Sequence, residues 1–320
     1  MTDIKNDLTA YQTPNTVRSL FEFAITLYGT LIFIYAGYIL WAGANYLLYG
    51  LVTMVTSLFF IRMFTIQHDC SHESMFKSLF LNRLVGRLCI LITTVPYRSW
   101  KAEHDSHHDH VVDIEKIGLG DVSLWTLEKY ESKGKVQQTL YRIYRNPLFL
   151  LVIAPFLYFF LRNRVPAIYD RKIIMSVVLT NIVLLVMYLI LVYYLGFWAV
   201  FFSMIIPAYI AGIIGVGLFY VQHQFPDARW FTTQEWSHVQ ASIEGSSLLV
   251  LPQPLEWFTY NIGYHHIHHV DSGVPAYRLK QCYQEVEAVG KKRPLTLMEI
   301  LSSFRLRLWS REQNKLIGIN

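Results

Sequence analysis

Four stretches of this 320-residue chain are long and apolar enough to cross a lipid bilayer, and no other feature constrains its fold as strongly. A helix needs about 20 apolar residues to span the hydrocarbon core. The stretches contain no acidic residue and a single basic one, Arg62, near the end of the second. Short uncharged turns join the first to the second and the third to the fourth, which predicts two hairpins of transmembrane helices. The predicted spans are 23–41, 46–64, 173–195 and 197–220.

The basic residues all lie on one side of this predicted topology. Two precede the first span, sixteen fall between Arg62 and Lys172, and ten follow the fourth span, which accounts for all 28 Lys and Arg residues. Cytoplasmic loops of membrane proteins carry an excess of Lys and Arg. We therefore expect a multi-pass membrane protein with both termini and the large central loop in the cytoplasm. A soluble protein with four buried core helices would not produce this asymmetry.

Two further segments are expected to be helices at the membrane surface, and the first of them either lies in the interface or dips partway into the bilayer. Residues 148–161 are apolar and are flanked by arginines at both ends. At about 1.5 Å per residue, a helix of that length is shorter than the roughly 30 Å hydrocarbon core. Residues 295–309 combine apolar and basic residues at helical spacing, which is typical of an amphipathic helix on a membrane surface.

Twelve histidines are the most informative residues for function, and all of them lie on the predicted cytoplasmic side. Three clusters stand out: HDCSH at 68–72, HDSHH at 104–108 and HHIHH at 265–269. Residues at positions i, i+3 and i+4 share one face of a helix, so each cluster can direct two or three imidazoles at one point. The first cluster directly follows the second span, and His223 follows the fourth span in the same way.

Neutral imidazole is a ligand for iron, zinc, copper and nickel. The clusters together with His223 offer more ligands than one ion can bind, which indicates two metal ions. A structural zinc site needs only four ligands and often uses cysteine, so a site of many histidines beside membrane spans indicates redox-active iron. Among the other histidines, His238 is interpreted as an ordinary residue and His110 stays undecided. The candidate metal ligands are His68, His72, His104, His107, His108, His223, His265, His268 and His269.

Several polar residues beside the clusters are candidates to orient these ligands. A metal-bound histidine usually donates its second ring N–H to a carboxylate or a carbonyl. The alternative for each of the acids is a solvated surface residue with no such role. The candidates are Asp69, Asp105, Asp109, Asn261 and His266, with Glu103 and Asp271 as further acids next to the clusters.

At these residues the sequence resembles the membrane fatty acid desaturases, over roughly residues 20–285. His68-Asp-Cys-Ser-His72 is similar to the first histidine box of that family, although Ser71 stands where glycine is common. VPYRSW at 95–100, followed by HDSHH, resembles the segment that leads into the second box. NIGYHHIHH at 261–269 resembles the third box of the acyl-lipid omega-6 (Δ12) group.

The resemblance implies an all-α fold, with four spans in two hairpins and a cytosolic helical cap that carries a non-haem di-iron centre. We expect a single domain over residues 1–320. The implied activity is the introduction of a cis double bond into a fatty acyl chain, with O₂ and two electrons from ferredoxin or a cytochrome b5-type protein. We expect the electron donor to be a separate protein. Because an unactivated methylene must be held beside the metals, we also expect a narrow apolar tunnel that enters the cap from the bilayer.

Two other functions remain open on the sequence alone. A hydroxylase or ketolase of alkanes, sterols or carotenoids uses similar histidine boxes, although the flanking residues favour desaturation. A metal transporter would place polar ligands near the middle of the bilayer, whereas the predicted span interiors lack both histidine and acid. The carbon that is oxidised stays open among Δ12, Δ5, Δ6, Δ9 and ω3, as do the chain length and the carrier of the acyl chain.

Overall fold

The computed structural model describes residues 2–319, and long helices form its membrane part. The helices α2 (Thr16–Ala42), α3 (Tyr46–Ser71) and α10 (Arg171–Leu195) are each long and apolar enough to cross a membrane, as is the run Phe197–His223. That run consists of α11 (Phe197–Val200), the π-helical η4 (Phe201–Ile205) and α12 (Ile206–His223). The four predicted spans are confirmed as helices, and the chain is a multi-pass membrane protein.

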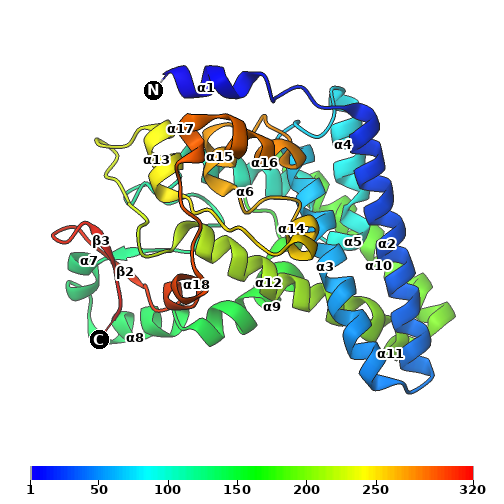
Figure 1. The fold of residues 1–320 in the computed structure, drawn as a ribbon. Helices are drawn as coiled ribbons and strands as arrows, with labels where there is room; N and C mark the ends of the chain where they lie inside the picture. The colour runs from blue at the N-terminus through cyan, green and yellow to red at the C-terminus, as the bar shows by residue number, and fades with distance from the viewer. Residues whose placement is uncertain (1, 320) are drawn as a thin grey trace.

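Local sequence explains how the two hairpins turn. The side chain of Asn45 accepts a hydrogen bond from Leu48 N and so caps the start of α3. Gly196 joins α10 to α11 with φ of +87°, a conformation that suits glycine because it lacks a Cβ atom. In Figure 1, α2 and α3 run side by side, and α12 crosses beside α3 towards the remaining helices. The end of α3 and the end of α12 thereby reach the same part of the molecule.

A cap of shorter helices packs over these two ends, and α1 lies across its outer side (Figure 1). Its main hydrophobic core combines α3 residues such as Ile66 with Phe76, Ile267 and Leu279, which come from distant parts of the chain. The remaining α-helices are α1 (Thr2–Thr9), α4 (Leu79–Leu88), α5 (Ile90–Thr93), α6 (Tyr97–Asp109), α7 (Leu127–Glu131), α8 (Lys135–Tyr144), α13 (His238–Gly245), α14 (Gln253–Phe258), α15 (His265–Val270), α16 (Ala276–Glu285), α17 (Glu287–Gly290) and α18 (Leu297–Ser303).

The apolar segment 148–161 is helical, as predicted. It forms a run of short helical elements that is bent by 57° from α8. Leu148 and Phe156 expose their side chains on one face, whereas Leu150 is buried and faces α12. One side of this run therefore packs against α12 while the other stays apolar and uncovered. Its elements are η1 (Phe149–Ile153), α9 (Ala154–Phe156), η2 (Leu157–Leu161) and η3 (Arg162–Arg164).

The C-terminal segment differs from the amphipathic helix predicted for residues 295–309. Only α18 is helical there, and the chain then enters a small three-stranded sheet. The strand β2 (Leu308–Ser310) pairs in parallel with β1 (Trp125–Thr126) and antiparallel with β3 (Lys315–Ile317). Trp309 is buried in this arrangement. The prediction was wrong at this end because pairing with a strand nearly two hundred residues away outweighed the local helical pattern.

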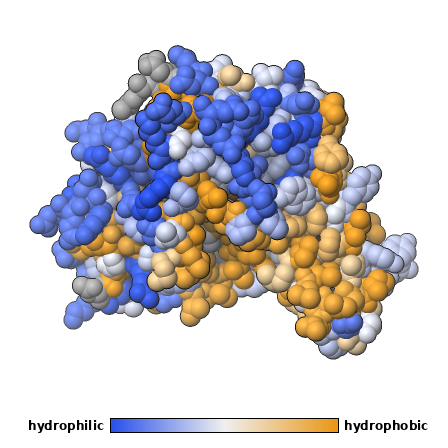
Figure 2. Space-filling model, in the orientation of Figure 1, coloured by the Kyte–Doolittle hydropathy of each residue, from blue (hydrophilic) through white to orange (hydrophobic). Residues whose placement is uncertain are grey.

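The surface separates into an apolar and a polar part. Figure 2 shows hydrophobic residues gathered over the lower right, where α2, α3 and α11 lie, whereas hydrophilic residues cover much of the upper cap. Ile32, Leu47 and Trp198 are among the exposed large apolar side chains of the long helices. An uncovered apolar surface of this extent fits contact with lipid tails.

Arg62 is a charged residue inside a membrane helix, and the structure gives it a full set of partners. Its side chain is only 1% exposed and lies over the ring of Trp257. It donates hydrogen bonds to Glu22 Oε2 (2.5 Å), to Thr26 Oγ1 (2.9 Å) and to the carbonyl of Trp257. These contacts tie α2, α3 and α14 together.

Replacement of Arg62 by Met should destabilise the fold by about 3 kcal/mol, because Glu22 would lose its closest cation in a low-dielectric environment. The measurement is thermal unfolding of the detergent-solubilised protein. Arg18 provides a matched control, since it also approaches Glu22 (3.6 Å) but is half exposed. Arg18→Met should cost about 1 kcal/mol or less. An equal loss of stability in both variants would show that the buried Arg62–Glu22 pair stabilises the fold no more than the exposed Arg18–Glu22 pair does.

Candidate metal centre

Four elements bring nine histidines together where the cap meets the membrane helices. His68 lies in the last turn of α3 and His72 caps its C-terminal end, so the first cluster continues the second span as predicted. His223 is the last residue of α12. The two HxxHH clusters lie on the short helices α6 and α15. All nine predicted ligands therefore converge, although they come from segments up to two hundred residues apart.

The nine imidazoles form two groups in which all candidate ligand atoms lie within 4.8 Å of one another. Each HxxHH cluster contributes to both groups, because neighbouring residues point about 100° apart on a helix. The pair at i and i+4 faces one group and the residue between them faces the other. We call them the first and second histidine groups: His68, His72, His104, His108 and His268 form the first, and His107, His223, His265 and His269 form the second.

The spacing of the ring nitrogens matches metal coordination. The Nε2 atoms of His104 and His108 lie 3.1 Å apart. In the second group, Nε2 of His265 lies 3.0 Å from Nε2 of His223 and from Nε2 of His269. An imidazole nitrogen binds a metal such as zinc at about 2.1 Å, which puts two ligands at right angles about 3.0 Å apart. The Nε2 atoms of His68 and His72 are buried and have no hydrogen-bond partner among the described residues.

The environment favours the neutral form of several of these imidazoles. Burial lowers the pKa of His104, His108 and His268 well below its ordinary value, and neighbouring imidazoles lower it further. Burial has the same effect on the pKa of His265 and His269. A neutral ring keeps a lone pair on one nitrogen, which is the form that binds a metal. The donor set therefore fits two metal ions.

Carbonyl and carboxylate oxygens contact the outward nitrogens of several rings. Asp121 Oδ1 lies 2.5 Å from His107 Nδ1. His223 Nδ1 donates to the carbonyl of Gly245 at 3.1 Å. Neither contact was predicted, because Asp121 lies in a loop with no histidine spacing and Gly245 contributes only its backbone. No local sequence signal marks either residue.

The predicted orienting residues have mixed outcomes. Asp69 comes within 3.4 Å of His68 Nδ1, and its second oxygen accepts a hydrogen bond from Ala276 N at 2.8 Å. Asp105 instead pairs with Lys101 on the surface. The other predicted residues are not in contact with either histidine group: Asp109 is exposed, Asn261 makes its hydrogen bonds through its backbone, the Nε2 of His266 donates to the carbonyl of Val289, and Asp271 accepts from Gln12.

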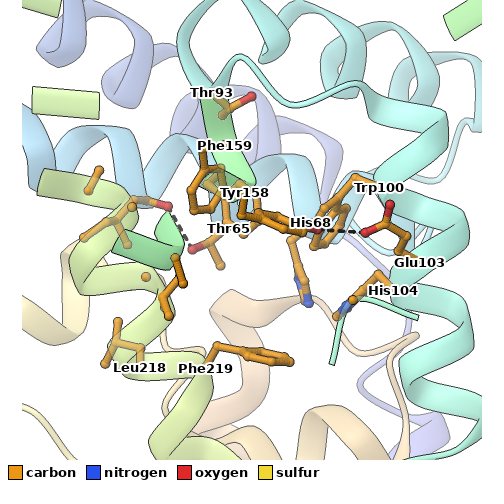
Figure 3. Close-up of a pocket in the computed structure, with 18 of the residues that line it drawn as sticks. Thr65, His68, Thr93, Trp100, Glu103, His104, Tyr158, Phe159, Leu218 and Phe219 are labelled. Carbon is orange, nitrogen blue, oxygen red and sulfur yellow. Dashed lines mark hydrogen bonds between the residues drawn. The ribbon is translucent and has the colours of Figure 1, made fainter. Parts of the chain in front are cut away.

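A cavity of about 440 Å³ ends at the two histidine groups. It reaches His68 and His104 of the first group and His107 and His265 of the second. Its walls are largely apolar and come from α3, α5, α6, α12 and the 149–164 run. Figure 3 shows His68 and His104 with their ring nitrogens turned into the same space, and Phe219 facing them from the opposite side. The cavity has the apolar character predicted for the tunnel.

One polar pair interrupts the apolar wall of this cavity. Tyr158 donates a hydrogen bond to Glu103 Oε2 at 2.9 Å, as Figure 3 shows, and Arg162 lies 3.5 Å from the other oxygen. Burial raises the pKa of Glu103, against the opposing effects of Tyr158 and Arg162. Glu103 lines the cavity next to His104 in the sequence and adds a polar group to its apolar wall.

The chain is similar to known proteins over most of its length. Residues 40–300 match the family model described as fatty acid desaturase. A protein from Bacillus subtilis named fatty acid desaturase is 35% identical over 276 residues, which cover 86% of this chain and 78% of that protein.

More distant relatives carry names that specify a position of oxidation. An sn-1 oleoyl-lipid 12-desaturase from Synechocystis is 26% identical over 68% of this chain and 62% of its own length. An sn-1 acyl-lipid omega-3 desaturase (ferredoxin) from Nostoc is 26% identical over 86% of this chain and 77% of its own length. The match to the Nostoc protein includes all three histidine clusters, since 86% of the chain must contain residues 68–269.

Proposed function

The chain belongs to the fatty acid desaturase family of O₂-dependent oxidoreductases, and from that premise we propose that it introduces a cis double bond at the Δ12 position of a membrane lipid's acyl chain. The observation that carries the proposal is the apolar cavity that ends on both histidine groups at once. A single acyl chain lying in this cavity passes within reach of both groups. A metal transporter would have no use for an apolar space of this size beside its ligands.

We assign the nine clustered histidines as ligands of two iron ions. The first histidine group would hold one ion and the second histidine group the other, with Asp121, Asp69 and the carbonyl of Gly245 orienting individual rings. When bound, the iron pair supplies the O₂-dependent oxidation of an unactivated methylene, which no amino acid side chain can perform. The neutral, buried imidazoles suit that role because they bring no competing protons or charge.

In the overall reaction, the –CH₂–CH₂– unit of the acyl chain loses two hydrogens, and O₂ takes these up with two electrons and two protons to give two molecules of water. The protein's own residues hold the acyl chain in place for this reaction. Apolar walls such as Phe64, Trp100 and Phe159 exclude bulk water and hold the reacting carbons in one position. Each buried methylene contributes about 0.8 kcal/mol to binding, so the cavity can bind a long chain without contacts to a headgroup.

Two kinds of sequence similarity support the Δ12 position. The third cluster and its leading residues, Asn261 to His269, resemble the omega-6 group. Relatives named 12-desaturases also match this chain, at 22–26% identity. The relative that is 35% identical carries a name without a position.

The electron donor is proposed from sequence similarity, and the orientation is proposed from charge. We propose that a separate carrier, such as ferredoxin or a cytochrome b5-type protein, supplies the electrons, since a similar protein from Nostoc is named as ferredoxin-dependent. We also propose that the cap faces the cytoplasm, because every Lys and Arg outside the predicted spans lies on its side of them.

The test is gas chromatography with mass spectrometry of the fatty acids of a host that expresses the protein. Derivatisation locates each double bond, and the expected product carries a new cis bond at Δ12. A new double bond at another carbon would contradict the Δ12 position but would still support desaturase activity. New hydroxyl groups without double bonds would instead support a hydroxylase, because the two products differ in mass.

A further inference from the structure

A second, much smaller cavity lies behind the second histidine group. Its volume is about 20 Å³, and His107, His223, Asp121 and Trp230 are among the residues that line it. His107, Asp121 and Phe219 line both cavities and so form part of the wall between them. The small cavity therefore adjoins the contact between His107 Nδ1 and Asp121 Oδ1.

Trp230 brings an unpaired donor to this small cavity. Its side chain is 93% buried, being 7% exposed, and no described residue accepts a hydrogen bond from its indole Nε1–H. The neighbouring Trp236 differs, because its Nε1 donates to the carbonyl of Val111 at 2.8 Å. A buried donor without a partner costs about 1–3 kcal/mol, so a partner for Trp230 is expected.

Asp121 brings acceptor capacity to the same cavity. Its Oδ2 accepts a hydrogen bond from Gly118 N at 3.1 Å, and its Oδ1 contacts only His107 among the described residues. Each oxygen of an ionised carboxylate can accept two hydrogen bonds. A cavity needs about 10–15 Å³ to hold one water molecule, and that water needs at least two polar partners. The small cavity meets both conditions.

We propose that this small cavity is a binding site for a single structural water molecule, which accepts a hydrogen bond from Trp230 Nε1 and donates one to Asp121. Trp230 is then a positioning residue: it acts through the water on Asp121, and Asp121 acts on the ring of His107. The role in metal binding rests on the proposed function, whereas the water site itself does not. Mutation of a residue that hydrogen-bonds to a metal ligand typically changes metal affinity by about 10- to 100-fold.

The first experiment is a high-resolution crystal or cryo-EM structure of the full chain. It should show density for one water molecule within hydrogen-bonding distance of both Trp230 Nε1 and Asp121. An empty cavity, or a direct hydrogen bond between Trp230 and Asp121, would overturn the water site. This experiment gives an answer whether or not the protein holds iron.

The second experiment follows the loss of iron from purified protein to a chelator. Trp230→Phe removes the indole N–H, and we expect iron to be lost about tenfold faster. Trp236→Phe is the matched control: it removes a hydrogen bond from the same region without touching the small cavity, and it should stay within about twofold of the wild-type rate. A wild-type rate for Trp230→Phe would contradict the positioning role.

A double variant separates positioning from packing. If Trp230 acts through Asp121, adding Trp230→Phe to Asp121→Ala should cause no further acceleration. An additional tenfold acceleration would mean that Trp230 contributes only its packing, and the positioning role would be rejected. Wild-type protein that binds no iron would count against the proposed function, and the structural experiment would then decide the water site alone.

Discussion

Loss of one imidazole from either histidine group should abolish product formation. We expect His108→Ala and His265→Ala each to lower the yield of unsaturated product by more than about 100-fold, the upper end of the effect seen for outer partners of metal ligands. His108 belongs to the first group and His265 to the second, so the pair tests both proposed ions. The iron content of the purified variants should fall as well, because each buried ring is a proposed ligand of one ion.

The control for these variants is a histidine outside both groups. His238 begins α13 and lies in neither group, so His238→Gln should keep both the product yield and the iron content. Lipid analysis of the expressing host and iron determination on purified protein give the two readouts. If His108→Ala or His265→Ala retained wild-type yield and iron, the assignment of these residues as ligands would be wrong. Active wild-type protein without iron would contradict the metal assignment altogether.

Filling the large cavity should lower activity strongly while the metal centre stays intact. Gly215 lies on α12 and lines this cavity, and a Cβ atom built there meets no other atom within 4 Å. Gly215→Phe would therefore place a ring in the space proposed for the acyl chain. Exclusion of about three methylenes costs about 2.4 kcal/mol at 0.8 kcal/mol each, which lowers kcat/KM by about 50-fold. We expect Gly215→Ala to cause a smaller loss.

Folding does not account for that expected loss. Glycine is the less favourable residue inside a helix, by up to about 1 kcal/mol relative to alanine. Gly50 supplies a matched control, since it lies in α3, also has open space around its Cβ position and does not line the cavity. Gly50→Phe should keep product yield, and both variants should keep wild-type iron content and melting temperature. Full activity of Gly215→Phe would show that the acyl chain lies elsewhere.

Local patterns predicted the elements well. The four spans follow from uninterrupted apolar stretches, and the structure has a long helix at each of them. The histidine clusters follow from i, i+3 and i+4 spacing, and each HxxHH lies on a helix. The helix predicted over residues 295–309 failed because long-range pairing decides the structure there. Leu308 and Trp309 read as part of a helix, but their partners in the sheet belong to β1 and β3.

Helical spacing accounts for the pairing of i with i+4 inside each HxxHH cluster, but it does not say which cluster's pair meets His68 and His72 and which meets His223. The spacing allows His104, His107 and His108 to face one point, yet His107 joins the second group. That outcome depends on the angle at which α6 packs against α3, α12 and α15. The same holds for Asp121, which reaches His107 from a loop without any recognisable motif. In the sequence, Arg62 is a single charge near the end of a span, and only the fold shows that Glu22 and Trp257 lie beside it.

By itself, the sequence determined the membrane helices and the helical spacing of the histidine clusters, because each depends on residues a few positions apart. Only the tertiary structure decided which imidazole faces which group, which oxygens hold the rings and where the apolar cavity ends. These features join segments far apart in the chain, so they depend on how whole helices pack, and the spacing of residues along one segment does not encode that.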